Sequence, residues 1–351
     1  MWLQLFFTPQ LGVISHNKLI KHFGTVENIF EQNVPSLEKF IKTACAKNLL
    51  ENIQIANITK SINWLNADER NHIVCYDDPI YPAILKELPD APIVLFAKGN
   101  LNLLKNNKFA IVGTRHPTEQ GAQNAYNMAY DLANNQLTII SGMAAGIDKF
   151  AHSGALKGKF STIGVIGTGI DLVYPRSNHQ LYHDVVNQNG LLISEFPLGT
   201  QPLAHNFPRR NRIVAGLSLG VLVVESSIDG GSMITADIAL EMGREVMAIP
   251  GSIHNPVASG CHKLIKSGAK LVETTNDILE DLPISISKLT YNSTPNSNPI
   301  LDIFGYEPIT VDEIMAKTKY TFGDLCALIL ELELNQEIVN CGGGRYQRIF
   351  K

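Results

Sequence analysis

Residues 1 to about 70 place apolar side chains at helical spacing, as in NKLIKHFGTVENIF and ITKSINWLN, with little clustering of β-branched residues. We therefore expect residues 1–70 to form a small helical domain of the SAM or helix-hairpin-helix kind. Prolines multiply in the next stretch, YDDPIYPAILKELPDAPIVLF. Because proline restrains the residue before it to extended conformations, we expect residues 71–107 to be an extended connector.

Between residues 108 and 282 the rhythm changes to short apolar runs separated by helical stretches. The runs are FAIVG, LTIISG, STIGVIG, GLLISE, LGVLVVES, EVMAIPG and AKLVET. Each run is nearly all apolar, as a strand covered on both faces must be, and each gap is long enough for a crossover helix. The pattern predicts an α/β domain with a Rossmann-like parallel sheet.

The C-terminal part begins with SKLTYNSTPNSNP, which has no apolar period and predicts a flexible linker over residues 283–298. Three compact segments follow, ILDIFGYE, TVDEIMAKTK and TFGDLCALILELEL, and then the hairpin-like EIVNCGGGRYQRIF. The second segment opens with a capping box of Thr310 and Glu313. Three helices and a glycine-tipped hairpin predict a winged helix over residues 299–351.

The last helix of that predicted winged helix is acidic. It contains Asp324, Glu331 and Glu333 but neither Lys nor Arg, so a DNA backbone would repel it. The composition therefore favours contact with protein over insertion into a major groove.

The composition of the whole chain narrows the class of protein. A length of 351 residues with 45% hydrophobic side chains predicts two or three domains with a sizeable core. The formal net charge of −4 requires any nucleic acid to be met by a local basic patch. The five cysteines form no C-x-x-C pair, which is typical of reduced cytosolic thiols. We find neither a signal-peptide pattern nor a stretch long enough to span a bilayer, and expect a cytoplasmic protein without membrane contact.

Glycines and hydroxyl residues follow the predicted strands. In an open parallel sheet ligands bind beyond the carboxyl ends of the strands, where glycines let backbone N–H groups approach and helix N-termini favour anions. Several such loops at one edge predict an anion pocket. The residues concerned are Gly113, Thr114, Arg115, Ser141, Gly142, Gly167, Thr168, Gly169, Glu225, Ser226, Ser227, Gly230, Gly231, Ser232 and Thr235.

Each loop alone is weak evidence, because a GTG after a strand is commonly a tight turn. The dinucleotide fingerprint also fails, since Leu172 stands where its third glycine belongs. The convergence of several loops on one edge carries the prediction.

The stretch FPRRNRIVAG adds three arginines, Arg209, Arg210 and Arg212, at the start of a predicted helix at that edge. Guanidinium groups can hold phosphates bidentately, and no acidic residue occurs between Phe196 and Val224 to neutralise them locally. The alternative is that one or two of these arginines pair with distant carboxylates and stabilise the fold.

Metal and catalytic readings are less well supported. His179 and His183 have i, i+4 spacing but lack the glutamate of a zinc protease motif. No G-x-S-x-G elbow and no catalytic triad is present. A nucleotide or nucleotide-sugar enzyme, with His152 or Glu195 as acid or base, is the rival to a binding protein. We expect no cofactor and no metal.

The motifs taken in order resemble one family, the bacterial DNA-processing protein A family, DprA or Smf. The resemblance runs from about Tyr81 to Asp281 through AIVGTRHPTEQG, IISGMAAGIDKFAH, TIGVIGTGIDLVYP, LLISEFPLGT, FPRRNRIVAGLS, VLVVESSIDGGSMITA, GREVMAIPG and GCHKLIKSGAKLV. It implies a non-enzymatic protein that binds and protects single-stranded DNA, loads the recombinase RecA during natural transformation, and forms a homodimer.

The resemblance also implies roles for particular residues. A phosphate pocket would be lined by Gly113, Thr114, Arg115, Ser141, Gly142, Gly167, Thr168, Gly169, Arg209, Arg210 and Arg212, and the dimer surface would include His262, Ile265 and Leu271. Two positions depart from the family pattern. Ala145 stands where an arginine is common, and Ser161 stands where a lysine is common. Lys159, two residues before Ser161, is a candidate substitute, while Phe160 is either a base-stacking or a core residue.

Overall fold

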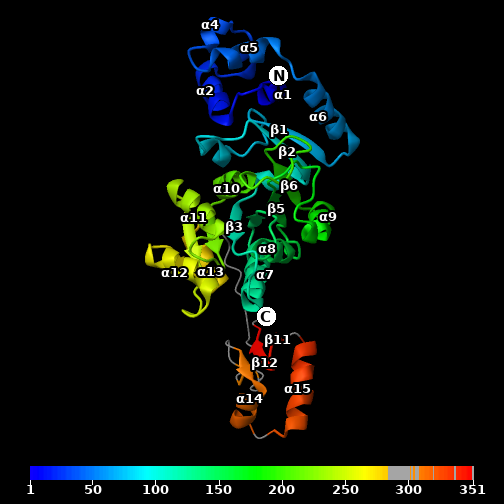
Figure 1. Cartoon of the computed structure of the whole chain (residues 1–351), viewed down its shortest axis with the longest axis vertical. Coiled ribbons are helices and arrows are strands. Elements are labelled where there is room, and N and C mark those ends of the chain that lie inside the picture. Colours follow the sequence, from blue (N-terminus) through cyan, green and yellow to red (C-terminus); the bar gives the residue numbers. More distant parts are fainter. Residues whose placement is uncertain (284–300, 302, 305–307, 319, 336, 350–351) are drawn as a thin grey trace.

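A computed structural model describes residues 1–283, 301, 303–304, 308–318, 320–335 and 337–349. The N-terminal domain is helical, as its sequence pattern predicts, and Figure 1 shows it at one end of the molecule. Its helices are α1 (Trp2–Phe7), α2 (Val13–Phe23), α3 (Val26–Phe30), α4 (Val34–Leu37), α5 (Thr43–Glu51) and α6 (Ile55–Ala67).

A mixed sheet forms the centre of the molecule. In the described part of the chain nine strands pair in the order β1-β2-β6-β5-β4-β3-β7-β8-β9. From β6 to β9 neighbouring strands run parallel, which confirms the Rossmann-like parallel sheet. The strands of the parallel part are β3 (Lys108–Val112), β4 (Thr138–Ser141), β5 (Thr162–Val165), β6 (Leu191–Ser194), β7 (Gly220–Val223), β8 (Glu245–Ala248) and β9 (Lys270–Leu271).

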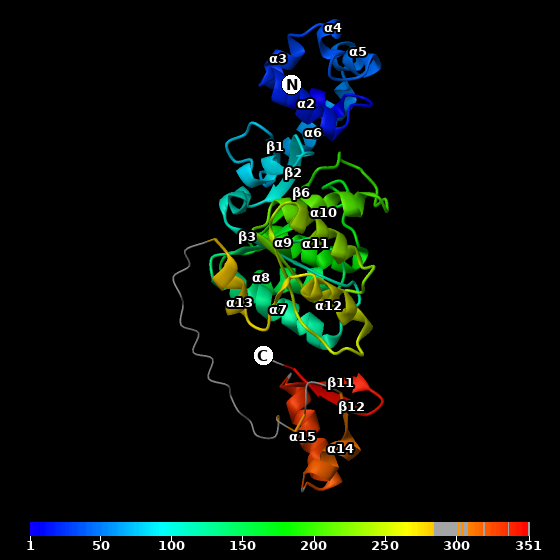
Figure 2. The same ribbon diagram turned by 90° about the vertical axis from the view of Figure 1, so that its left-hand side faces the viewer.

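Helices cover both faces of this sheet, so its strands are buried and apolar on both sides. One face packs Ala110, Val165 and Val223 against α10 (Asn206–Gly216), α11 (Gly231–Glu241) and α12 (Ser259–Lys266). The other face packs Phe109, Ile139 and Leu222 against α7 (Glu119–Asn134), α8 (Ile147–Ala155) and α13 (Thr275–Asp281). Figure 2 shows α7, α8 and α13 grouped in the lower half of this domain and α10 above them, next to β6. The remaining crossover helix is α9 (His179–Asn187).

Residues 71–107 are more than the extended connector that the sequence suggested. They form β1 (Asn71–Cys75) and β2 (Val94–Gly99), and β2 pairs antiparallel with both β1 and β6. Phe96 on β2 lies 5.9 Å, ring to ring, from both Phe6 and Trp64, so this added pair of strands carries the contact with the N-terminal domain. The prolines and the short helices η1 (Ala83–Glu87) and η2 (Leu101–Lys105) interrupt the strand pattern, which is why it was missed.

The C-terminal part contains α14 (Val311–Lys317), α15 (Phe322–Leu334) and a small sheet of order β10-β12-β11. Its strands are β10 (Ile309–Thr310), β11 (Ile338–Gly342) and β12 (Arg345–Arg348). The predicted capping box is present, because Thr310 and Glu313 bond each other's backbone at the start of α14. Residues 284–298 of the predicted linker and most of the first predicted helix, ILDIFGYE, lie outside the described residues.

Candidate nucleic-acid interface

A cleft lies at the carboxyl edge of the sheet, where the strand order reverses. From β3 the chain continues to β4 on one side, whereas β7, reached later, lies on the other side of β3. Such a switch point is where open α/β sheets bind ligands. A cavity of about 560 Å³ opens there and shares residues with a smaller one of about 70 Å³. The residues common to both are Arg115, Gly142, Ala144, Tyr174, Phe207 and Arg210.

Arg115 is the exposed cation of this cleft. It follows β3 in the turn that begins at Gly113, and its guanidinium carbon lies 5.9 Å from the centre of the Phe207 ring. Within the residues that the structure describes, Arg115 has no ion pair. Its charge is therefore available to an anion in the cleft.

The loop after β4, residues 142–146, is held in one conformation by two buried side chains. Oδ2 of Asp148 accepts hydrogen bonds from the amides of Gly142 at 3.0 Å and Ala144 at 3.3 Å. The side-chain nitrogen of Asn178 donates to the carbonyls of Met143 and Ala144, both at 2.9 Å. These bonds fix a loop in which Met143 has a φ of 57°, a conformation that costs energy for any residue but glycine.

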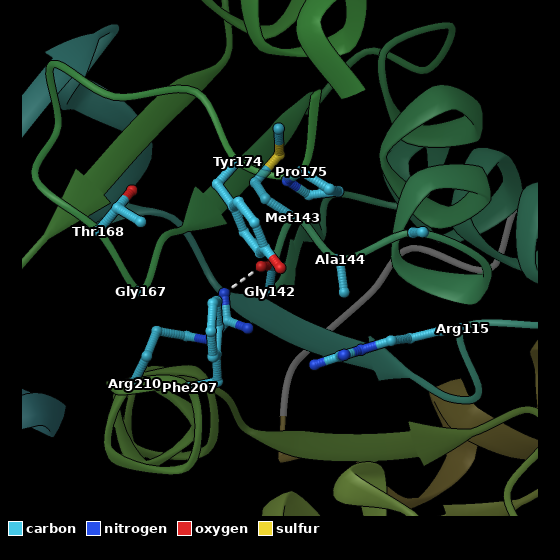
Figure 3. A pocket seen from close by; sticks show the side chains of 11 residues that line it. Arg115, Gly142, Met143, Ala144, Gly167, Thr168, Tyr174, Pro175, Phe207 and Arg210 are labelled. Atoms are coloured by element: carbon cyan, nitrogen blue, oxygen red, sulfur yellow. Dashed lines mark hydrogen bonds between the residues drawn. The ribbon is translucent and has the colours of Figure 1, made fainter. Parts of the chain in front are cut away.

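Arg210 forms the inner wall of the cleft. Its Nη1 donates to the carbonyls of Gly142 and Val165, and Figure 3 shows the first of these bonds. An added Cβ at Gly142 would lie 2.6 Å from the guanidinium carbon of Arg210, so only glycine fits there. Burial lowers the pKa of Arg210 to about 10, while the nearby carboxylate of Asp148 raises it, and Arg210 remains cationic at neutral pH. Burial also raises the pKa of Asp148.

Two aromatic rings stand beside these arginines. Tyr174, 43% exposed, and Phe207 on α10 lie with ring centres 5.4 Å apart and planes inclined by 36°. Figure 3 shows both side chains directed at the space between the Gly142 loop, Arg115 and Arg210. An exposed ring packed on a partly buried one, next to a guanidinium without an ion pair, can hold both the flat and the charged part of a nucleotide.

Helix N-termini complete the cleft. The helices α8, α10 and α11 all begin after a strand of the parallel sheet, so their positive dipole ends face this edge. Gly230, Gly231 and Ser232 of the α11 start line the larger cavity. The hydroxyl of Ser232 donates to that of Ser226 at 2.8 Å, which ties α11 to the loop after β7.

The structure brings many of the predicted site residues together. In the larger cavity lie Gly113, Thr114, Arg115, Gly142, Arg210, Gly231 and Ser232, and in the smaller one Gly167 and Thr168.

Three other predicted residues lie elsewhere. Ser141 turns its hydroxyl to the carbonyl of Ile111 at 2.6 Å and is fully buried. Gly169 packs against Pro197 and Gly199 instead of the cavities. Lys159 precedes β5 and so lies at the amino ends of the strands, opposite the cleft, which excludes it as a substitute for a pocket lysine.

The expectation that all three arginines are free is corrected by two carboxylates from other elements. Arg212 is 7% exposed, with Nη2 2.5 Å from Oε2 of Glu195 and Nε 3.0 Å from Oδ2 of Asp90. Arg209, whose side chain is 48% exposed, also bonds Oε2 of Glu195 at 3.1 Å. Neither arginine lines the cavities, so the alternative of pairing with distant carboxylates holds for both.

Sequence reasoning missed Asp148, Tyr174 and Asn178. Asp148 and Tyr174 line the cavities, and Asn178 holds the loop after β4. Asp148 was visible as the acidic residue ending GMAAGID, and Tyr174 as the aromatic residue following GTGIDLV. Asn178 gave no signal, because its role depends on a contact with a loop 34 residues earlier in the chain.

Metal and membrane chemistry find no support in the described residues. No group of three or more His, Cys, Asp or Glu side chains there could hold a metal ion, and the rings of His179 and His183 lie with their centres 4.6 Å apart. Every described helix is too short or too polar to cross a bilayer.

Comparison with known proteins decides the family. Residues 72–283 match the family model described as DNA recombination-mediator protein A, and residues 288–344 match the DprA winged helix domain. The chain belongs to the DprA/Smf family. Protein Smf of Escherichia coli is 39% identical over 300 residues, which cover 82% of this chain and 80% of the relative. DNA processing protein DprA of Streptococcus pneumoniae is 48% identical over 204 residues, 58% of this chain and 72% of the relative.

Solved DprA structures share the fold. The crystal structure of Streptococcus pneumoniae DprA matches 81% of this chain and 98% of its own at 37% identity, with a TM-score of 0.72. DNA processing protein A of Helicobacter pylori, whose structure describes a single-stranded DNA binding mode, matches 60% of this chain and 97% of its own at 30% identity and a TM-score of 0.55. A DNA-processing role for this DprA/Smf protein follows from the family.

Proposed function

We propose that this protein binds single-stranded DNA in the cleft at the carboxyl edge of its sheet. The observation that carries the proposal is the unpaired, exposed Arg115 beside the rings of Tyr174 and Phe207. Proteins usually bind a single strand in a groove that combines cationic side chains, which contact the DNA phosphates, with aromatic rings on which the bases stack. The Helicobacter pylori relative, with its single-stranded DNA binding mode, supports this choice of ligand.

The phosphates would be held by charge and by backbone amides. Arg115 supplies a mobile guanidinium, and Arg210 supplies a fixed one whose Nη2 has no hydrogen-bond partner among the described residues. Ala145 lines the smaller cavity just before the start of α8, and its amide donates to no described residue. Such N–H groups at a helix start are well suited to an anion.

The bases would stack on Tyr174 and Phe207. Both rings expose apolar surface, and a base of any sequence has a flat face to lay on it. The paired bases of a duplex are already stacked on each other, so this contact favours single strands. Asp148, the one carboxylate among the described lining residues, is occupied by two backbone amides and offers little base-edge recognition. Binding with little sequence preference follows.

The wider biological role is proposed on the family's description as a recombination mediator. We propose that the protein protects incoming single-stranded DNA in the cytoplasm, loads RecA during natural transformation, and acts as a homodimer without enzymatic activity or cofactor. The dimer surface would be α12 and β9, the last strand of the sheet, where Leu271 is 43% exposed. Ile265 packs partly into the core beside it, and His262 bonds the carbonyl of Gly251 at 2.9 Å. Sedimentation of Leu271→Glu, expected to be monomeric at micromolar concentration, tests this surface.

The decisive experiment is a salt series of oligo-dT binding by fluorescence anisotropy, comparing the wild type with Arg115→Ala. Each phosphate contact adds about 0.7 to the slope of log affinity against log salt for single strands. Arg115→Ala should therefore bind more weakly and lose about 0.7 of that slope. Lys105→Ala is the matched control, because Lys105 is exposed and precedes β3 at the opposite edge of the sheet.

An unchanged slope in Arg115→Ala, or an equal loss in Lys105→Ala, would remove the cleft as the site. A thermal-shift series with mononucleotides separates the rival nucleotide enzyme. A DNA-binding cleft that needs several phosphates gives little stabilisation by a mononucleotide, whereas an enzyme site for nucleotides gives a clear rise in Tm.

A further inference from the structure

Helix α15 of the winged helix has two apolar faces. One face carries Leu325, Ile329 and Leu332 into the small C-terminal core, where they are at most 4% exposed. A surface helix of a monomer is expected to be polar on the remaining face. That expectation fails here.

The second apolar face is exposed. Phe322, Leu330 and Leu334 are 61%, 57% and 76% exposed, and Cys326 between them is also exposed. The spacing of four residues places these side chains in a row along one side of the helix, about 18 Å long at 1.5 Å per residue. We call this row the α15 stripe. A contiguous apolar surface of this kind marks an interaction site.

The charge beside the α15 stripe is acidic. Glu333 lies three residues after Leu330, and Glu331 lies three residues before Leu334, so both carboxylates are neighbours of the stripe. Both are exposed, and neither has an ion pair among the described side chains. The C-terminal end of the helix dipole adds further negative potential near Leu334.

This acidic charge determines which kind of molecule can bind the α15 stripe. DNA of either kind is repelled, because its phosphates carry the same sign. A second copy of α15 would bring four glutamates together across an apolar contact, which costs free energy. A helix with its own apolar row flanked by lysine or arginine satisfies both the apolar surface and the carboxylates.

We propose that the α15 stripe is the docking site for a basic amphipathic helix of a partner protein. Leu330 and Leu334 supply the buried contact, while Glu331 and Glu333 set the sign of the partner's charge. The site is separate from the DNA cleft, so its occupation and DNA binding are independent measurements.

The test uses the full-length protein and three labelled 18-residue peptides followed by anisotropy. The first peptide has leucines at helical spacing and lysines elsewhere, the second has the same composition scrambled, and the third replaces lysine by glutamate. We expect only the first to bind. The double variant Leu330→Ser/Leu334→Ser should weaken it at least about tenfold, since the two exposed leucines provide most of the apolar contact.

A charge-reversal pair separates specific attraction from net charge. Glu331→Lys/Glu333→Lys should weaken the first peptide about tenfold at low salt and less at high salt. Its matched control, Glu38→Lys/Glu51→Lys, changes the net charge equally on exposed positions of the N-terminal domain and should bind as the wild type does.

A thiol-protection assay locates the peptide without any substitution. Cys326 lies within the α15 stripe, and Cys341, also exposed, lies on β11. The bound peptide should slow alkylation of Cys326 several-fold, measured by mass spectrometry, and leave the rate at Cys341 unchanged.

Three results would overturn the proposal. The scrambled peptide could bind as well as the first, both cysteines could be protected equally, or Leu330→Ser/Leu334→Ser could bind the first peptide undiminished. Sedimentation adds a fourth: a wild type that is larger than Leu330→Ser/Leu334→Ser would make a second copy the occupant. Oligo-dT affinity is measured in parallel and should be unchanged in all α15 variants. With that result, a failure of the α15 proposal would not count against DNA binding in the cleft.

Discussion

Arg210 and Arg212 lie two residues apart on α10, yet they belong to two regions with different electrostatics. Arg210 faces the cleft and is held by the carbonyls of Gly142 and Val165, with the carboxylate of Asp148 nearby but no ion pair among the described residues. Arg212 is neutralised by Glu195 and Asp90 in what we call the Arg212 network. The positive charge of a sequence cluster is therefore divided between the cleft that we propose binds DNA and structural pairing. The division depends on which residues the fold brings near each guanidinium.

The largest effect expected from separating the roles of Arg210 and Arg212 is a loss of stability in Arg212→Ala. Arg212→Ala leaves the buried carboxylate of Glu195, 4% exposed, with only the half-exposed Arg209 as partner. Breaking a buried ion pair from one side costs about 3–5 kcal/mol, so we expect the free energy of unfolding to fall by this amount. Urea denaturation followed by circular dichroism measures it.

Arg209→Ala is the matched comparison, because it removes an exposed arginine from the same carboxylate. We expect a loss of about 0–1 kcal/mol, the range for exposed pairs. Equal losses in the two variants would mean that the Arg212 network is not the structural half of the cluster.

The next effect belongs to the cleft. Phe207→Ala removes a stacking surface, and each base stacked on a ring contributes about 1–3 kcal/mol. We expect oligo-dT affinity to fall by about 5- to 150-fold, with the salt slope unchanged because no charge is lost. Anisotropy over the same salt series as for Arg115→Ala measures both quantities. If Phe207→Ala lowered the salt slope but kept its oligo-dT affinity at high salt, the base would not stack on Phe207.

A third effect concerns the layer of side chains beneath the cleft. His152 on α8 is fully buried beside Arg210, and burial lowers its pKa to about 3. Since the hydroxyl of Thr162 donates to the carbonyl of Ile139, it accepts from Nδ1 of His152 at 2.7 Å, which places a proton on Nδ1. The lowered pKa keeps the ring neutral at neutral pH.

This depressed pKa makes the cleft layer acid-sensitive. Between the ordinary pKa of 6.5 and the folded value of about 3 the unfolded chain binds one more proton. The contribution of His152 to the free energy of unfolding is therefore complete above pH 6.5 and falls by about 1.4 kcal/mol per pH unit below it. In urea denaturation between pH 6 and 4, His152→Gln should lose this part of the pH dependence of the free energy of unfolding. The burial of His16, with a pKa of about 4, contributes a second share that the variant keeps. An identical slope in wild type and variant would contradict the prediction.

Much of the fold could be predicted from the sequence, because short β-branched apolar runs indicate buried strands and the longer segments between them indicate crossover helices. The loops at strand ends also located the cleft, since parallel strands bring their carboxyl ends to one edge. The added strands β1 and β2 were not accessible, because prolines and two short helices obscure their alternation.

The positions of the candidate site residues were predicted correctly where chain order decides position, and missed where tertiary contacts decide it. Gly113, Arg115 and Gly142 follow strands and lie in the cleft. Arg212 was misjudged because one of its partners, Asp90, is 122 positions away in a stretch taken for a connector. The other partner, Glu195, follows a different strand, 17 positions earlier. Lys159 was a different kind of error, because its place before β5 already assigns it to the wrong edge.

Asp148 and Asn178 hold the loop after β4 through hydrogen bonds within the protein itself. If the cleft binds DNA as proposed, a loop fixed in this way needs no folding step when a strand binds. Capture should then proceed at a rate governed by diffusion and ionic strength, and the entropy of ordering falls on the DNA alone.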